Sequence, residues 1–240
     1  MYKRQIKDAY QSTIGESFTG LKLILWSIPL FWFREWIFAD KPNIALISTI
    51  GAAFLILISG FLVEISYNTI AKNSEIVPGA NFLSMGFNGF LGLLATGVYA
   101  AICYFGANFA CGFVKTGDAA IDMTLEIMIW FIFLGFAFAG YTIFIRRLNV
   151  FEAYNPIKFM KAYPEAFLSG AFLVVKLAII NAIVIGFISY LFWLFLGFDN
   201  YLIKFIWCIT IMYNLVIGAN YLAQLSEEIF AFEERLNDNN

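Results

Sequence analysis

The sequence has no histidine among its 240 residues, and only 13% of the residues are charged. The lack of imidazole excludes catalytic triads of the Ser-His-Asp and Cys-His types, together with most zinc and haem ligation. Basic residues number 15 and acidic residues 17, a balance that disfavours a nucleic-acid partner. Three cysteines, Cys103, Cys111 and Cys208, lie in or beside apolar runs, so they indicate no disulfide framework.

Motifs for nucleotide chemistry and for acyl transfer are missing as well. The chain contains neither a glycine-rich loop followed by Lys-Ser/Thr nor a Gly-x-Ser-x-Gly elbow. No pair of cysteines has metal-ligand spacing, and carboxylates without histidine make a poor catalytic metal site. We therefore expect a protein that is not an enzyme and that holds no cofactor.

Apolar residues make up 61% of the chain, whereas a soluble domain has about 45–50%. A bilayer core about 30 Å thick requires about 20 apolar helical residues, and continuous runs favour helices over the alternating strands of a barrel. We predict an all-α, polytopic transmembrane helical bundle that forms one domain over residues 1–240. Its six expected spans cover residues 21–38, 44–65, 84–110, 123–145, 173–197 and 201–225.

The first of these segments allows two interpretations, because Arg34 and Glu35 interrupt it before Trp36. It is either a short span with Trp32 and Trp36 as interfacial anchors, or a helix that lies in the headgroup region.

With six spans, both termini lie on the same side of the membrane. Eleven of the 15 basic residues then fall on that side, so the positive-inside rule predicts cytoplasmic termini in a bacterial inner membrane. These eleven are Lys3, Arg4, Lys7, Lys22, Lys72, Arg146, Arg147, Lys158, Lys161, Lys176 and Arg235, and the other four are Arg34, Lys41, Lys115 and Lys204.

Two long connectors, residues 67–83 and 146–172, face the predicted cytoplasmic side, and an acidic tail at 226–240 is expected to fray into solvent. In the second connector, apolar side chains intersperse with basic ones, as in amphipathic segments that lie on an anionic membrane face. Pro156 and Pro164 are expected to divide it into short helices. Its candidates for docking a membrane face or a protein partner are Arg146, Arg147, Phe151, Lys158, Phe159 and Lys161. Shared features of the two connectors also suggest a parallel internal duplication.

Three carboxylates at the fourth span form the first candidate for ion coupling. Asp118, Asp122 and Glu126 are spaced i, i+4 and i+8, which places them along one helical face. They form either a cation or proton site at the outer mouth or a solvated helix N-terminus that the macrodipole favours. The second interpretation fits Asp118 and Asp122 better than it fits Glu126, which sits deeper.

Polar residues inside the spans form a second candidate set. An ionisable group there indicates a functional site, whereas asparagines also join helices by hydrogen bonds. An ion pair between Glu64 and Lys176 is one specific expectation. The members of this set are Glu64, Lys176, Asn88, Asn108, Asn181, Asn214 and Asn220.

The third span is rich in glycine and alanine, as is part of the fourth. Small residues let helix backbones approach closely in lipid, so we expect these two spans at the centre of the bundle. Alternatively, residues 86–97 form a flexible segment of a transport path. The small residues are Gly86, Gly89, Gly92, Ala95, Gly97, Ala100, Ala101, Gly106 and Ala107, followed by Gly135, Ala139 and Gly140.

Several short motifs recur in a known arrangement. An IKDAY start and a hydrophobic hairpin precede NTIAKNSEIVPGANFLSMGFNGFLGLL, and GYTIFIRRLNVFEAYNPIKFMKAYPEAF and ANYLAQLSEE follow. In this order the chain resembles an uncharacterised family of six-span prokaryotic inner-membrane proteins, with Val77-Pro78 and Tyr163-Pro164 at the matching positions. The resemblance implies a helical membrane protein without an assigned activity, and it carries over no catalytic residue.

Two functions of different classes follow from these observations. The first is a non-enzymatic, permease-like or transport-accessory or scaffold subunit that docks a soluble or membrane protein partner through its cytoplasmic connectors. The alternative is a stand-alone cation- or proton-coupled carrier of small solutes that uses Glu126, Lys176 and the span asparagines. A homo-oligomer built on the small-residue spans also remains open.

Overall fold

The computed structural model describes residues 9, 11, 13, 19–38, 43–73, 75–79, 81–197 and 200–237, the side chains of residues 196 and 231–237 excepted. Every regular element in this part of the chain is a helix, so the all-α prediction is confirmed. The helices are α2 (Thr19–Ile37), α3 (Ile44–Ile70), α4 (Phe82–Phe113), α5 (Ala119–Arg147), α6 (Val150–Ala153), α7 (Pro156–Leu196) and α8 (Tyr201–Asn237).

Asparagine or aspartate side chains begin five of these helices. Each acts as an N-cap, and its side-chain oxygen accepts hydrogen bonds from backbone N–H groups that the first turn leaves unpaired. At α7 the cap is followed by Pro156, whose fixed φ suits the first helical position and which has no N–H to satisfy. The caps are Asn43, Asn81, Asp118, Asn149 and Asn155.

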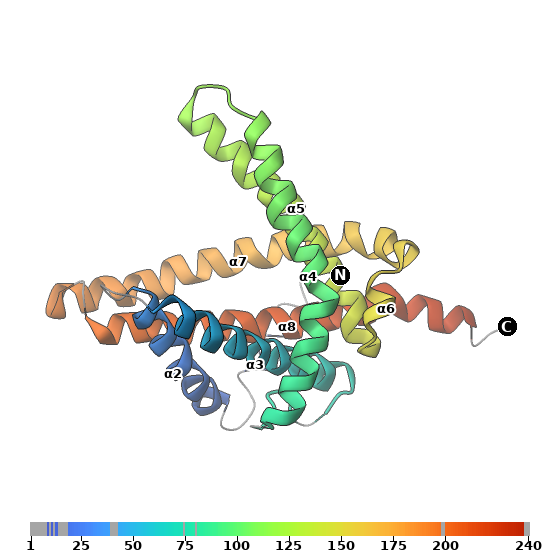
Figure 1. The fold of residues 1–240 in the computed structure, drawn as a ribbon, viewed down its shortest axis with the longest axis horizontal. Coiled ribbons are helices and arrows are strands. Elements are labelled where there is room, and N and C mark those ends of the chain that lie inside the picture. Colours follow the sequence, from blue (N-terminus) through green and yellow to red (C-terminus); the bar gives the residue numbers. More distant parts are fainter. Residues whose placement is uncertain are drawn as a thin grey trace.

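The helices α3, α7 and α8 run along the long axis of the molecule, whereas α4 and α5 form an antiparallel hairpin that crosses them steeply (Figure 1). The inner half of α5 packs against α3, α7 and α8, whereas α4 packs mainly against α3, α5 and α6. The expected central position is therefore confirmed for α5 and wrong for α4. The turn between α4 and α5 stands apart at the top of the view. None of the residues from 108 to 134 is buried, so the outer half of the hairpin projects from the bundle.

Two glycines determine how closely α3 and α4 cross. A Cβ atom added to Gly60 would lie 1.8 Å from the carbonyl oxygen of Met85, and one added to Gly89 would lie 1.8 Å from that of Ile56. Backbone therefore meets backbone at this crossing, as in other membrane helix pairs that pack through small residues.

The main core joins α2, α3, α4 and α8. Leu23, Phe61, Met85 and Val216 are fully buried there, and Val77 closes the cluster from the connector between α3 and α4. Helix α2 is thus packed onto the bundle along one side.

Five helices are long and apolar enough to cross a membrane: α3, α4, α5, α7 and α8. We therefore describe the chain as a helical membrane protein. Helix α2 does not meet the same criterion, because Lys22, Arg34 and Glu35 all lie within its 19 residues. Length and composition thus allow five spans in the described part of the chain.

Two expectations for the predicted connectors and tail are wrong. Pro164 does not divide the second connector, because α7 runs without a break from Pro156 into the apolar segment. The start of the acidic tail is not solvated, since the Ser226 hydroxyl donates to the carbonyl of Thr142 at 2.7 Å and Phe230 is buried. Several residues behind the predicted orientation lie outside the described part of the chain, namely Lys3, Arg4, Lys7, Lys41 and the side chain of Arg235.

Candidate functional site

After α5 the chain turns back through α6 into α7, and residues 150–163 form a surface that we call the α6–α7 platform. Tyr99 of α4 supports it from beneath. Its ring stacks on Phe159 with centroids 5.0 Å apart and planes 2° apart, and on Tyr154 at 5.8 Å. Its hydroxyl donates to the carbonyl of Ala153 at 2.5 Å. Because aromatic pairs add about 0.5–1.5 kcal/mol each beyond their buried area, this stack holds the platform firmly on α4.

A cluster of three charged side chains, which we call the clamp, joins α6 to α5 and to α7. The Lys158 ammonium lies 2.8 Å from one carboxylate oxygen of Glu152, and the Arg147 guanidinium lies 3.1 Å from the other. The hydrogen bond from Lys158 and the two positive charges lower the pKa of the Glu152 carboxyl below its ordinary value of 4.5. Glu152 is therefore ionised at neutral pH, and it ties α6 to both α5 and α7.

The outer face of the platform is apolar and accessible. Phe151, Ile157 and Met160 are 88%, 79% and 76% exposed, respectively. Phe151 lies on α6, and Ile157 and Met160 lie three residues apart in the first turns of α7, next to Phe159 of the aromatic stack. The segment that carries these exposed side chains is therefore held in place on α4.

The structure sorts the six predicted docking residues into different roles. Phe151 is exposed, Arg147 and Lys158 form the clamp with Glu152, and Phe159 lies in the aromatic stack. Arg146 and Lys161 both lie over the ring of Phe230 on α8, at 5.0 and 5.8 Å from its centroid. Cation–π contacts of this kind fix the platform to α8, so these two residues do not form a free basic surface.

The expected ion pair between Glu64 and Lys176 is not formed. Glu64 instead accepts hydrogen bonds from the Ser84 hydroxyl at 2.5 Å and from the Asn88 amide at 3.4 Å, both on α4. No hydrogen bond or ion pair joins Lys176 to another described residue. Because α3 and α4 approach closely at the glycine crossing, two α4 side chains lie nearer to Glu64 than α7 does. The Glu64 cluster therefore stabilises the α3–α4 contact.

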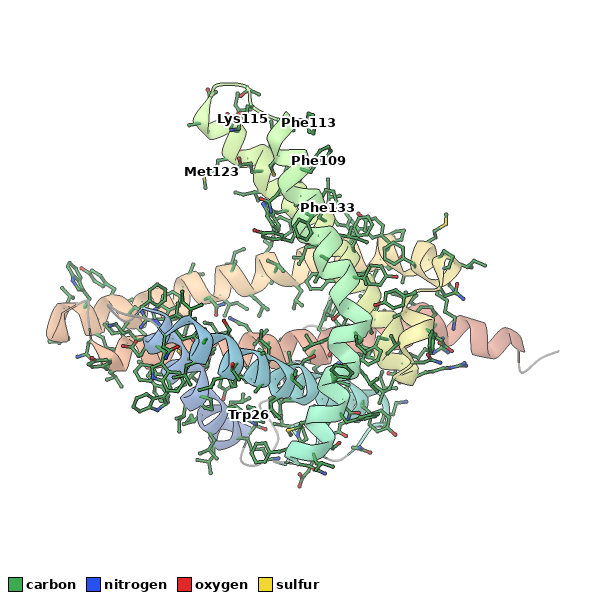
Figure 2. The ribbon with its side chains drawn as sticks, viewed as in Figure 1. Trp26, Phe109, Phe113, Lys115, Met123 and Phe133 are labelled. Atoms are coloured by element: carbon green, nitrogen blue, oxygen red, sulfur yellow. The ribbon has the colours of Figure 1, made fainter. Side chains whose placement is uncertain are left out.

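The three carboxylates near the α4–α5 turn do not converge. Asp118 caps α5 by accepting from the N–H groups of Ala120 and Ile121, and Asp122 accepts from the N–H and hydroxyl of Thr116. Glu126 is exposed on α5 one turn after Met123, which Figure 2 labels on the projecting end of the hairpin. Among the described residues, no group of three or more Cys, Asp or Glu side chains could hold a metal ion.

Two of the predicted span asparagines line the same cavity. Asn181 of α7 and Asn214 of α8 line one cavity of about 400 Å³, which we call the two-amide cavity. Neither amide forms a hydrogen bond with another described residue. A second cavity of about 470 Å³ lies beside it, among α3, α4, α5, α7 and α8, and shares Leu177 and Asn214 with it.

One interhelical network was not predicted. The Ser66 hydroxyl of α3 lies 2.8 Å from the Tyr141 hydroxyl of α5 and donates to the carbonyl of Ala219 on α8 at 3.1 Å. Tyr141 also donates to the carbonyl of Leu62 at 3.1 Å. A serine and a tyrosine within apolar runs were the only sequence signal, because their partners are mostly backbone carbonyls that any residue could supply.

The arrangement thus contains a preformed apolar surface at one end of the helices and an amide-lined cavity between two of the spans. Both are suited to binding, and neither assembles a nucleophile with a base. Compared with protein-family models, with curated proteins and with solved structures, the chain shows no match.

Proposed function

We propose that the chain is an integral membrane protein without catalytic activity, a permease-like or transport-accessory subunit, that docks a soluble protein partner through the α6–α7 platform. The observation that carries this proposal is the exposed outer face of Phe151, Ile157 and Met160. Apolar side chains grouped on a rigid surface are typical of protein interaction sites. The stack beneath them also supports the proposal, because a preformed surface loses little conformational freedom when a partner binds.

The proposal includes a topology in which α2 is the sixth span, both termini are cytoplasmic and the membrane is a bacterial inner membrane. A 19-residue helix is about 28 Å long, close to the thickness of the hydrocarbon core. Trp32 and Trp36, 56% and 37% exposed, are suited to anchoring its outer end at the interface. Arg146 and Arg147 directly follow the fourth span, which favours a cytoplasmic platform.

Site-specific photocrosslinking in native membranes tests the docking. The photoreactive residue p-benzoylphenylalanine replaces Ile157 in one variant and Met160 in another. A matched control replaces Phe109, which is 71% exposed but lies on the projecting hairpin. We expect the two platform variants to crosslink to the same protein and the control to form only lipid adducts.

A second substitution tests whether the crosslink depends on the apolar face of the platform. Phe151→Ser, introduced beside the photoreactive residue at 157, should weaken the protein crosslink severalfold because it removes the most exposed apolar side chain of the face. If the platform variants form lipid adducts only, the platform rests on the membrane surface and the docking proposal is wrong.

The alternative, a carrier coupled through Glu126, receives less support. Glu126 is exposed on the projecting hairpin, and no hydrogen bond joins it to another described residue. Of the residues on which such a carrier would depend, Asn181 and Asn214 line a common cavity. The size and lining of that cavity are suited to a ligand from the bilayer.

A further inference from the structure

The two-amide cavity has an aliphatic wall with a few polar groups. The aliphatic wall includes Leu177, Ile185 and Ile206, and its polar groups are those of Asn181, Thr210, Tyr213 and Asn214. The Thr210 hydroxyl already donates to the carbonyl of Ile206 at 2.9 Å, within its own helix. The two amides and the Tyr213 hydroxyl therefore remain to be satisfied by something inside the cavity.

Unpaired amides are unusual in this position. Both asparagines are half-buried in helices that are apolar enough to span a membrane, where an amide without a hydrogen-bond partner is strongly disfavoured. Asparagines that only join helices would bond to each other or to a group on the facing helix, as Asn88 of α4 does with Glu64 of α3 at 3.4 Å. Asn181 and Asn214 do neither, although they line the same space.

The neighbouring cavity offers room for an apolar chain. Its wall is formed largely by aliphatic residues, among them Leu173, Val174 and Leu215, and it meets the two-amide cavity at Leu177 and Asn214. The two cavities are about 470 and 400 Å³, within the range of sites that hold small molecules. Among the described residues, no charged side chain lines either of them, so a charged headgroup would find no counter-ion there.

We propose that these two cavities together bind one neutral amphiphile from the bilayer. Its hydroxyl-bearing head hydrogen-bonds to Asn181 and Asn214, and its aliphatic chain lies in the neighbouring cavity. This site is independent of docking at the α6–α7 platform, because it uses residues 173–188 of α7, whereas the platform ends at residue 163. A long-chain alcohol or a monoacylglycerol has this chemistry.

Photolabelling of the purified protein in lipid nanodiscs tests the site. Three probes carry the same diazirine-bearing sixteen-carbon chain and differ only at one end: a hydroxyl, a carboxylate or a methyl group. We expect the alcohol to label α7 and α8 peptides around residues 177–185 and 206–217. Labelling by the alkane and by the carboxylate should be weaker there by about tenfold, since neither probe offers a neutral hydrogen-bonding head.

Substitutions separate recognition from folding. The double substitution Asn181→Leu and Asn214→Leu should lower labelling by the alcohol to the level of the alkane, whereas Asn108→Leu, the matched control, should leave it unchanged. A second variant, Leu177→Phe, keeps both amides and fills the space that the two cavities share. It should also abolish labelling by the alcohol, and it decides the matter if the double variant does not fold.

Three results would overturn the inference. The first is equal labelling by the alcohol and the alkane in the wild-type protein, which would show that the chain alone partitions into a lipid-facing groove. The second is labelling by the alcohol that persists in Leu177→Phe. A double variant that loses thermal stability while its labelling by the alcohol is unchanged would likewise assign the asparagines to helix association.

Discussion

Alanine at Gly89 is the sharpest test of how the hairpin is held. The added Cβ would lie 1.8 Å from the carbonyl oxygen of Ile56 and 2.7 Å from the backbone nitrogen of Gly60. Ordinary contact begins near 3.4 Å, so α3 and α4 must separate by about 1.6 Å along this line. Because the obstructing atoms belong to the backbone, no side-chain rotation can relieve the clash.

The expected cost follows from the size of that displacement. Overpacking in a well-packed contact costs about 1–3 kcal/mol, and a backbone clash belongs near the upper end. Separation of the helices also weakens the hydrogen bonds from Ser84 and Asn88 to Glu64, which span the same contact. For a chain of this length, about 3 kcal/mol corresponds to a drop in the unfolding midpoint of roughly 6–12 °C.

The same helix supplies matched controls. A Cβ atom at Gly86 or Gly97 would meet no atom within 4 Å, so alanine there adds no clash. Each control should gain up to about 1 kcal/mol from helix propensity and keep or raise the midpoint. Gly60→Ala, opposite on α3, should match Gly89→Ala, since its Cβ would lie 1.8 Å from the carbonyl oxygen of Met85.

Thermal unfolding in a mild detergent at a fixed heating rate, followed by fluorescence-detected gel filtration, measures these differences. The double variant at positions 60 and 89 adds a further condition. Once one alanine has separated the helices, the second should cost clearly less than it does alone. The reasoning fails if Gly89→Ala and Gly86→Ala unfold at the same midpoint, or if the two clashing alanines are fully additive.

Three further predictions concern the platform and the interhelical network. Tyr99→Ala removes the stacking partner of α6 and α7, so a spin label at Met160→Cys should become mobile, whereas Tyr99→Phe, which keeps the ring, should restrict it nearly as in the wild type. The ionised Glu152 carboxylate holds the platform at pH values above 4.5, and this contact is lost as the pH falls through the lowered pKa of Glu152. The spin label at Met160→Cys should therefore become mobile only below pH 4.5, and its mobility should not depend on pH in Glu152→Gln. Ser66→Ala removes the hydroxyl that joins α3, α5 and α8, and it should cost about 0.6–1.7 kcal/mol in the thermal assay.

The helices could be predicted from the sequence because a long, continuously apolar run in a membrane forms a helix. The runs at 44–65, 84–110 and 123–145 each fall within one helix, and asparagine or aspartate caps begin those helices. The roles of Asp118 and Asp122 at a helix N-terminus agree with the more conservative of the two sequence interpretations.

The contacts between the helices could not be predicted in the same way. A span that is apolar on every side has no pattern that separates a protein-facing from a lipid-facing side. Gly86, Gly89 and Gly97 look equivalent in the sequence, yet Gly89 alone meets the backbone of another helix. The opposite charges of Glu64 and Lys176 predicted an ion pair between them. Glu64 instead bonds to Ser84 and Asn88, because the glycine crossing brings α4 close to it.

The glycine crossing also connects the hairpin to the cavities. Between residues 108 and 134 no residue of the hairpin is buried, and Phe109, Phe113 and Met123 are 71%, 74% and 64% exposed on the projecting end (Figure 2). In a bilayer this exposure carries no hydrophobic penalty, because lipid tails solvate such side chains as well as a protein core does. The angle of the hairpin is set by the α3–α4 crossing together with the packing of α5 against α7 and α8. Ala100 of α4 and Ala137 of α5 line the second cavity, so a change at Gly89 should alter photolabelling there. The platform is held by Tyr99 and by Phe230 of α8, so it should keep its crosslinks.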